Sequence, residues 1–238
     1  MNLACIDIGN TNVVIGFYKD NKLVNVKRFE TDKNEIIKNI DFKNIKSIAI
    51  SSVVPEIEKF ILSKISTSCF NISFINSNIN LDIESPSEVG NDRICNMKVV
   101  IEKKLYPAII VDFGSATTYD VINDIGHFIG GAIAPGVDVS AQNLFKKAAQ
   151  LNKVDFKIPQ SVIGKNTITN LQSGIMYGGI DAINGMLNRI KKEMKGKINN
   201  IILTGGFSKI LSQYIEHKHT LDPNMTLDGI KLIWEENQ

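Results

Sequence analysis

The chain has 238 residues, the size of one large domain or two small ones. Its 27 lysine and arginine residues nearly balance 25 acidic residues, so the overall charge does not favour nucleic-acid binding, and recurrent apolar segments exclude a disordered chain. No apolar run is long enough to span a bilayer, no secretory signal is recognisable, and three cysteines fit neither a disulfide framework nor a metal pair. We therefore expect a cytoplasmic globular protein with no membrane or nucleic-acid partner.

The first part of the sequence alternates apolar segments with polar turns, a pattern typical of strands and short helices. The expected strands cover residues 3–8, 12–18, 23–29, 47–54 and 70–75. The expected helices cover residues 32–40, 55–66 and 92–105, with a polar loop over 76–89. Pro55 suits the first turn of its helix, where the missing N–H removes no hydrogen bond.

The second part continues the alternation of strands and helices. Strands are expected at 107–113, 117–122 and 200–203, and residues 126–136 are rich in glycine. Helices are expected at 137–150, at 170–194, shortly after Gly206 and around 232–236. The alternation predicts an α/β architecture.

Two segments share one order of residues: a buried strand, Asp-x-Gly, small polar residues and a second strand. They are CIDIGNTNVVIGFY, which contains Asp7, and IVDFGSATTYDVI, which contains Asp112. Almost half the chain separates the two aspartates, a distance too long for a solenoid repeat. The repetition predicts two similar lobes, residues 1–105 and 106–238, with a cleft between them.

Both repeated turns have the residues of a phosphate-binding loop. Glycine lets a backbone approach a ligand closely, and exposed N–H groups in a turn form a concave anion site. A carboxylate beside phosphates is suited to holding Mg²⁺ or its water ligands. Taken alone, the turn at Asp7 is also compatible with an ordinary hairpin; the second turn at Asp112 and the Thr204-Gly205-Gly206 segment together favour the phosphate-binding interpretation.

This ordered set resembles the ATPase superfamily that includes actin, heat-shock chaperones and sugar kinases. Within it, the sequence is more similar to type III pantothenate kinases over roughly residues 3–210. The motifs that carry this resemblance are Gly90-Asn91-Asp92-Arg93, GGAIAPG at 130–136, Gly164-Lys165-Asn166-Thr167 and Gln172-Ser173-Gly174. The resemblance implies an α/β fold of two ribonuclease-H-like lobes of the actin/sugar-kinase type, with an ATP cleft between them.

The resemblance also implies a role for each matching residue. Those expected to bind ATP with Mg²⁺ are Asp7, Ile8, Gly9, Asn10, Thr11, Asn12, Val13, Val14 and Ser115. Those expected to bind pantothenate are Gly90, Asn91, Asp92, Arg93 and Thr167, with Asp92 as the general base. Asp112 would bind a monovalent cation, K⁺ or NH₄⁺. The resemblance further implies a homodimer whose active site lies near the shared interface.

The chemistry of Asp92 and Arg93 agrees with these roles. A carboxylate can accept the proton of an acceptor hydroxyl, and an arginine can hold the carboxylate of pantothenate through two hydrogen bonds. Without the resemblance, a helix N-cap and a surface charge would explain the pair. Two positions depart from the family pattern: Ser115 replaces a commoner threonine and keeps its hydroxyl, and Ile83 stands where a pocket-lining tyrosine is frequent.

Other motifs give no competing site. The sequence lacks GxxxxGK[ST], HExxH and GxSxG, and its three histidines have no paired ligand spacing. The basic run over 189–197 ends an expected helix, where cations complement the helix dipole. The resulting hypothesis is an ATP-dependent pantothenate kinase that makes 4′-phosphopantothenate for coenzyme A synthesis. The alternatives are a related kinase for another alcohol such as a sugar, a regulatory or accessory factor, and a silent scaffold.

Overall fold

The computed structural model describes residues 2–40, 42, 45–148 and 151–238, and the structural statements below refer to these residues. The chain separates into two compact units. Unit 1 consists of Met1–Leu105, Ile125–Gly130 and Asn224–Gln238, and unit 2 of Tyr106–Asp124 and Gly131–Pro223. The boundary expected after residue 105 therefore differs from these units in two segments, 125–130 and 224–238, which pack with the N-terminal part of the chain.

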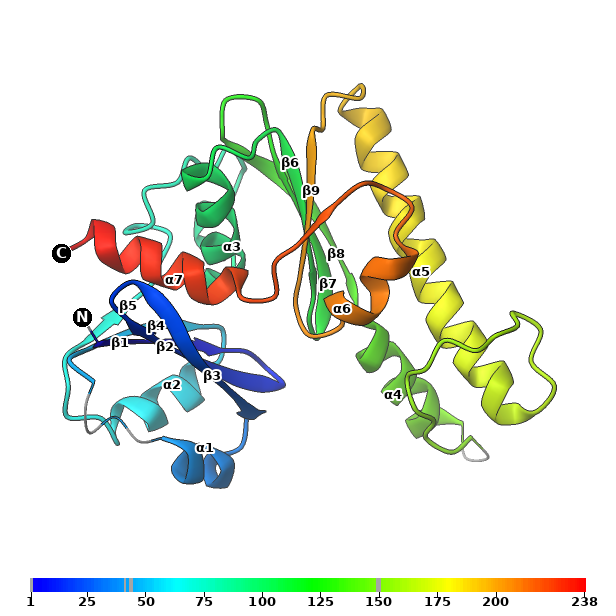
Figure 1. The fold of residues 1–238 in the computed structure, drawn as a ribbon, viewed down its shortest axis with the longest axis horizontal. Helices are drawn as coiled ribbons and strands as arrows, with labels where there is room; N and C mark the ends of the chain where they lie inside the picture. Colours follow the sequence, from blue (N-terminus) through cyan, green and yellow to red (C-terminus); the bar gives the residue numbers. More distant parts are fainter. Residues whose placement is uncertain (1, 41, 43–44, 149–150) are drawn as a thin grey trace. The chain divides into compact units, whose positions relative to one another are not determined.

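Unit 1 is a five-stranded sheet with helices on both faces (Figure 1). Its strands, in the order β3-β2-β1-β4-β5, are β1 (Asn2–Ile8), β2 (Asn12–Lys19), β3 (Lys22–Glu30), β4 (Ser47–Ser52) and β5 (Cys69–Asn71). Its helices are α1 (Lys33–Asn39), α2 (Pro55–Leu62), the 3-10 turn η1 (Pro86–Glu88), α3 (Asn91–Glu102) and α7 (Met225–Glu236).

The central strand β1 divides its side chains between two layers, as alternation along a strand requires. Ala4, Ile6 and Ile8 join the core that also contains Ile36 of α1 and Ile61 of α2. Leu3, Cys5 and Asp7 point to the opposite face. Helices α3 and α7 cover that face, since both contact β4 and α7 also contacts β1.

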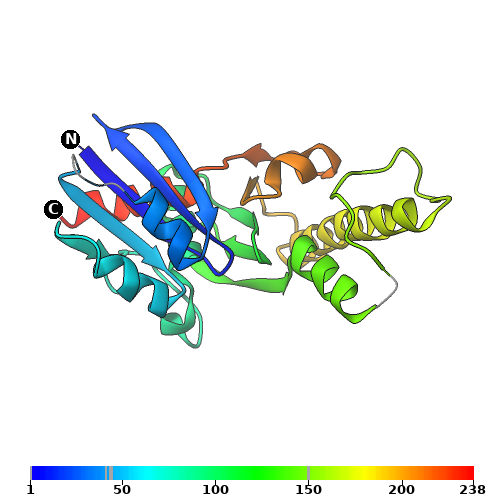
Figure 2. The same cartoon turned by 90° about the horizontal axis from the view of Figure 1, so that it is seen from below.

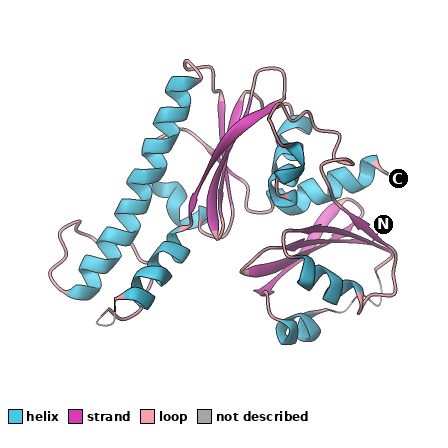
Figure 3. Ribbon diagram, turned by 180° about the vertical axis from the view of Figure 1, so that it is seen from behind, coloured by secondary structure: helices cyan, strands magenta, loops and turns pink. Residues whose placement is uncertain are grey.

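Unit 2 is built around a second five-stranded sheet. Its strands, in the order β10-β9-β6-β7-β8, are β6 (Ala108–Phe113), β7 (Ala116–Ile122), β8 (Phe128–Pro135), β9 (Asn200–Thr204) and β10 (Thr220–Leu221). The first residues of β8, 128–130, belong to unit 1. Its helices are α4 (Val137–Lys147), α5 (Thr167–Glu193), α6 (Ser208–Leu211) and the 3-10 turn η2 (Ser212–Tyr214). Figure 3 shows α5 as the longest helix of this unit, with α4 packed beside it.

The segment that precedes α5, residues 151–166, is extended and runs along the N-terminal half of this helix (Figure 2). The hydroxyl of Tyr177 donates to the carbonyl of Pro159 at 2.8 Å, and the side-chain amide of Gln172 donates to the carbonyl of Asp155 at 3.1 Å. The helix itself begins with a capping box, because the Asn166 side chain accepts from the Thr169 N–H and Thr169 returns a bond to the Asn166 backbone. This box starts α5 at Thr167, earlier than the expected residue 170.

The two sheets share one strand order. In each, the first strand lies between its antiparallel hairpin partner and a parallel strand that enters later in the sequence: β1 between β2 and β4, and β6 between β7 and β9. A third strand follows the hairpin partner, and a short strand closes the other edge. The repeated sequence pattern at Asp7 and Asp112 therefore corresponds to a repeated topology.

Strand β8 forms where the sequence indicated only a glycine-rich segment. A Cβ atom on Gly131 would overlap the backbone carbonyl of Tyr119 in β7. Glycine is unfavourable in strands generally, but here it allows the neighbouring backbone to approach closely. Composition alone therefore did not predict a strand in this segment.

Most other expected elements form, with shifted ends. Strand β5 and helix α4 are shorter than expected, and residues 149–150 at the end of the latter lie outside the described residues. Helix α7 starts at Met225, well before the expected 232, and the short strand β10 was not predicted. None of the helices in the described part of the chain is both long enough and apolar enough to cross a membrane.

Candidate functional site

The first Asp-x-Gly turn connects β1 to β2 and is held by backbone hydrogen bonds. The Gly9 N–H donates to the Asn12 carbonyl at 3.0 Å, and the Thr31 hydroxyl donates to the Gly9 carbonyl at 2.7 Å. A Cβ on Gly9 would lie only 3.2 Å from the Asn12 carbonyl oxygen. Asn10 and Thr11 at the tip are exposed, so the turn is a fixed loop whose tip can meet a ligand.

The predicted ATP-binding residues in this segment divide into two groups. The side chains of Ile8, Val13 and Val14 are buried in unit 1. Asn10 and Thr11 present theirs to solvent. The buried residues can therefore contact a nucleotide only through their backbone, and their side chains serve to anchor the loop.

The second group of predicted residues lies at the start of α3, where Gly90 is the N-cap. The Asn91 side-chain amide donates to the Ser52 carbonyl at the end of β4, at 3.2 Å. The Arg93 N–H donates to Oδ1 of Asp92 at 2.8 Å. A Cβ on Gly90 would lie 2.5 Å from the same carboxylate oxygen. A side chain at position 90 would therefore displace the Asp92 carboxylate.

The environment of Asp92 changes its acidity. Burial raises the pKa of this carboxyl above its ordinary value, while the Arg93 N–H and the Arg93 charge oppose the rise. A carboxylate with a raised pKa is a stronger base than an exposed one. This property suits a residue that accepts a proton, and catalytic carboxylates are commonly tuned in this way.

Ser51 and Cys95 connect the first turn to the start of α3. The Ser51 hydroxyl lies 3.5 Å from Oδ1 of Asp7, a long contact, and an interaction with Ser51 lowers the pKa of the Cys95 thiol. Burial raises the pKa of that thiol well above its ordinary value, and the negative charges of Asp7 and Asp92 add to the rise. Both carboxylates therefore lie within electrostatic reach of Cys95, and unit 1 brings them to one region.

Arg93 lies over an aromatic ring of the same unit. Its guanidinium carbon is 5.5 Å from the ring centroid of Phe128, which is buried. The backbone of Phe128 in turn bonds to both Asn80 and Asp82, so the loop that contains half-buried Ile83 is tied to it. The stacking orients the guanidinium, as an aromatic face favours a cation.

In unit 2, the second Asp-x-Gly turn connects β6 to β7. The Gly114 N–H donates to the Ala116 carbonyl at 3.0 Å, and the Gly136 N–H donates to the Ser115 carbonyl at 3.1 Å. A Cβ on Gly136 would overlap the carbonyl of Gly114. Besides Gly131, the GGAIAPG motif therefore requires its last glycine, which allows the start of α4 to lie directly against the turn that carries Ser115.

Asp112 is surrounded by close backbone approaches and a hydroxyl. Gly205, which follows β9, has φ +88°, and a Cβ there would overlap Oδ1 of Asp112. Thr118 lies opposite Asp112 in the β6–β7 ladder, so the two side chains share one face of the sheet. Its Oγ1 is buried and has no hydrogen-bond partner in the described part of the chain. A carboxylate beside such an oxygen is a donor set that a hard cation can use.

Thr167 is the first residue of α5 and its side chain is exposed. The structure thus groups Asp7 with the 90–93 segment in unit 1, and Asp112 with Ser115 and Gly205 in unit 2. Thr167 lies at a separate position of unit 2. A common site formed by all of them stays a prediction.

Sequence reasoning missed the polar residues that support the predicted ones. Ser51 and Cys95 lie inside apolar runs, and Thr118 lies in a strand, so each looked like a core residue. The roles of Ser51 and Thr118 depend on neighbours across the sheet, and that of Cys95 depends on the strands that α3 packs against. The only sequence signal was a hydroxyl or a thiol among apolar residues. Across the residues that the structure describes, no three histidine, cysteine, aspartate or glutamate side chains gather as metal ligands.

Comparisons with known proteins identify the family. The family model described as Type III pantothenate kinase matches residues 3–189. A relative from Bacillus cytotoxicus named Type III pantothenate kinase is 38% identical, and the match covers 98% of this chain and 95% of that protein.

Solved structures show the fold. A Campylobacter jejuni protein described as a conserved Baf family transcriptional activator has a TM-score of 0.65 at 19% identity, over 98% of both chains. Component A of (R)-2-hydroxyglutaryl-CoA dehydratase from Acidaminococcus fermentans has a TM-score of 0.56 at 13% identity, over the whole of both chains. These likenesses confirm the expected α/β fold, which has two five-stranded sheets. Because the family model matches most of the chain and the Bacillus cytotoxicus relative is 38% identical, the chain belongs to the type III pantothenate kinase family.

Proposed function

We propose that this chain transfers the γ-phosphoryl group of ATP to pantothenate and that Asp92 is the general base. Family membership supports the reaction, the first step of coenzyme A synthesis. The observation that carries the assignment of Asp92 is its half-buried carboxylate, held at the start of α3 by the Arg93 N–H, and desolvation there raises its pKa. Asp7 lies in the same region of unit 1 and would face the phosphates.

In the proposed step, the Asp92 carboxylate accepts the proton of the primary hydroxyl of pantothenate. The hydroxyl oxygen forms a bond to the γ-phosphorus of ATP as the bond from that phosphorus to the β,γ-bridging oxygen breaks. The products are 4′-phosphopantothenate and ADP, and the proton leaves on Asp92. The reaction depends mainly on alignment and on stabilisation of charge, because the transferred group passes through a loose transition state.

Arg93 would hold the carboxylate end of pantothenate. A guanidinium can donate two parallel hydrogen bonds to a carboxylate, and stacking on Phe128 orients it for that contact. Asn91, fixed to the Ser52 carbonyl, keeps the start of α3 in place. Gly90 would allow close approach of the substrate, and the exposed Thr167 hydroxyl would donate to pantothenate.

The two Asp-x-Gly turns would hold ATP, the first through the backbone of residues 8–14 and the second through Ser115. Mg²⁺, which accompanies ATP in kinases, neutralises phosphate charge when bound. A monovalent cation, K⁺ or NH₄⁺, would be held by Asp112. The unpartnered buried hydroxyl of Thr118 beside this carboxylate supports that assignment.

We further propose a homodimer with the active site near the shared interface, and a reducing compartment such as the cytoplasm. The exposed apolar side chains of Val162, Ile163 and Ile168, near the first turn of α5, support a protein contact next to Thr167. Cys5 and Cys95 are buried and all three cysteines are free, which suits a reducing compartment.

The direct test incubates purified protein with ATP, Mg²⁺ and pantothenate, in potassium or in sodium alone, and follows phosphopantothenate by mass. We expect product in potassium and much less in sodium. Product that is independent of potassium would refute the cation role of Asp112 and leave the kinase. Phosphorylation of a sugar instead of pantothenate, or DNA binding without any phosphoryl transfer, would refute the proposed reaction.

A further inference from the structure

Helix α3, which begins with the proposed substrate-binding residues, has no exposed side in its middle. Seven consecutive residues, from Ile94 to Val100, are buried. One of them is Lys98, whose side chain is only 2% exposed. A buried ammonium is costly unless acidic partners compensate it. The surroundings of Lys98 therefore show which other element fixes α3.

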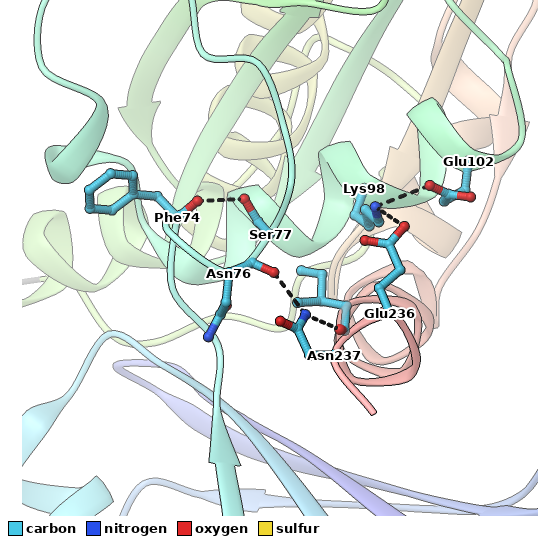
Figure 4. Close-up of polar contacts among 8 residues, drawn as sticks. Phe74, Asn76, Ser77, Lys98, Glu102, Glu236 and Asn237 are labelled. Atoms are coloured by element: carbon cyan, nitrogen blue, oxygen red, sulfur yellow. Dashed lines mark hydrogen bonds and ion pairs between the residues drawn. The ribbon is translucent and has the colours of Figure 1, made fainter.

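Lys98 pairs with two glutamates, one from α3 and one from α7 (Figure 4). Its ammonium lies 3.0 Å from Glu102 and 2.5 Å from Glu236. The hydrogen bond from Lys98 is the main reason that the pKa of Glu102 is lowered. Figure 4 also shows Asn237, which follows α7, donating to the carbonyl of Asn76 at 3.0 Å. The C-terminal end of α7 is thus tied both to α3 and to the loop after β5.

The N-terminal part of α7 contacts α3 closer to the proposed site. A Cβ on Gly229 would overlap the backbone carbonyl of Cys95. The Thr226 hydroxyl donates to Oδ1 of Asn96 at 2.9 Å. Residues 226, 229 and 236 lie on one face of α7, because they follow helical spacing. This single face therefore contacts α3 from its second turn to its last.

The close contact at Gly229 fixes the distance between α7 and α3. Cys95 is only three residues after Asp92, about one helical turn. A rigid helix transmits a displacement at one turn to the next. Any group that separates α7 from α3 at Gly229 therefore moves the Asp92 carboxylate and the Arg93 guanidinium with it.

We propose that α7 is a positioning element for pantothenate phosphorylation, with Gly229 and Glu236 as positioning residues that set where α3 presents Asp92 and Arg93. The family-model match ends at residue 189, before α7. The inference rests on the proposed function for its kinetic consequence. It assigns the last helix to the acceptor-substrate side of the site.

The main test uses Gly229→Ala and Glu236→Gln in the full chain. We expect Gly229→Ala to raise the KM for pantothenate about tenfold or more, and Glu236→Gln about threefold, with the KM for ATP changed by less than about twofold. Glu236→Gln keeps the shape of the side chain, so it remains informative if Gly229→Ala does not fold.

Two variants serve as matched controls. Gly185→Ala makes the same change in α5, where a Cβ would meet no atom within 4 Å. Tyr18→Phe removes a different bond of α7, the 2.7 Å bond from the Tyr18 hydroxyl to Asp228, without touching α3. We expect Gly185→Ala to resemble the wild type. Tyr18→Phe should lower Tm while the KM for pantothenate stays unchanged.

A second readout separates the failure of this inference from failure of the proposed function. The Ile94 N–H donates to the Gly90 carbonyl at 3.1 Å in the first turn of α3, and its hydrogen exchange can be measured without turnover. We expect faster exchange at Ile94 in Gly229→Ala than in Gly185→Ala. If the wild type makes no phosphopantothenate, the proposed function fails and exchange alone decides this inference. Wild-type KM and wild-type exchange in folded Gly229→Ala and Glu236→Gln would overturn it.

Discussion

The turns after β1 and β6 share the order Asp-x-Gly, and their strands occupy equivalent places in two sheets of the same topology. Their aspartates nevertheless have different neighbours. Asp7 lies beside hydroxyl and thiol groups from β4 and α3, whereas Asp112 lies against the backbone of Gly205 and opposite Thr118. The hairpin is thus common to both units. The parallel strand beside it, β4 or β9, determines which groups surround each carboxylate.

From this difference we infer separate roles for the two units in the proposed reaction. In unit 1, the parallel strand β4 ends next to the start of α3, so the carboxylate of Asp7 shares its region with a potential base. In unit 2, the parallel strand β9 is followed by Gly205, which lets the backbone approach Asp112 where a side chain would otherwise stand. The first arrangement suits proton transfer, and the second suits the binding of a cation.

The largest expected effect comes from Asp92→Asn, which tests whether unit 1 supplies the base. We expect kcat to fall by about 10²–10⁴-fold, the usual contribution of a general base. ATP binding should change little, because asparagine keeps the acceptor oxygen for the Arg93 N–H. Steady-state kinetics and nucleotide titration measure both quantities, and wild-type turnover would contradict the assignment.

The same variant tests the acidity of Asp92 through stability. Because the pKa of Asp92 is raised in the folded state, the stability that its protonated form contributes is present below the unfolded pKa, about 4, and is lost as pH rises through the folded value. Asparagine does not ionise, so Asp92→Asn should raise Tm at pH 7 and have little effect near pH 3. A lower Tm of the variant at pH 7 would contradict the burial argument.

A smaller effect is expected from Gly205→Ala, which tests the crowding around Asp112. The new Cβ would overlap the carboxylate and would also adopt an unfavourable positive φ. We expect the free energy of unfolding to fall by about 2–4 kcal/mol. Gly196→Ala is the control, since Gly196 has φ +74° and open space around it, and should cost about 1–2 kcal/mol. Equal losses in chemical denaturation would mean that Asp112 is not crowded.

The smallest effect is expected from Thr118→Val, which tests the cation role in unit 2. Without potassium, removing a buried unpartnered hydroxyl should stabilise the fold by about 1 kcal/mol. Potassium activation should need an about tenfold higher concentration, as for other changes around a metal site. Thr117→Val is the control, because the Thr117 side chain faces the opposite side of β7, toward a cavity lined by α4 and α5. Identical potassium dependence of both variants would contradict the proposal.

Local patterns were sufficient to predict much of this fold. The strand at residues 108–113 and the helix at 91–102 follow from apolar runs and a helix start signal. Strand β8 did not follow, because its glycines are unfavourable in a strand until the approach of Tyr119 is known. The candidate site shows the same limit: the motif residues were recognisable, but Ser51 and Thr118 acquire meaning only through pairing across the sheet.

Lys98 illustrates the limit most clearly. In the sequence it is an ordinary lysine of a helix, and its burial depends on Glu236, which is 138 residues away. No local pattern predicts that such distant residues meet. The same reason explains why the boundary predicted after residue 105 groups α7 with residues 106–238, whereas α7 packs in unit 1.

The return of α7 to unit 1 has a consequence for the order of folding during synthesis. A ribosome releases β1–β5 and α3 early, but the helix that contacts α3 emerges only after the whole of unit 2 has been made. During this interval, the face of α3 that contacts Gly229 and Glu236 in the folded chain has no partner helix. Nascent chains that stop before residue 224 should therefore expose an apolar surface that a chaperone can bind, and the released chain of 238 residues should not.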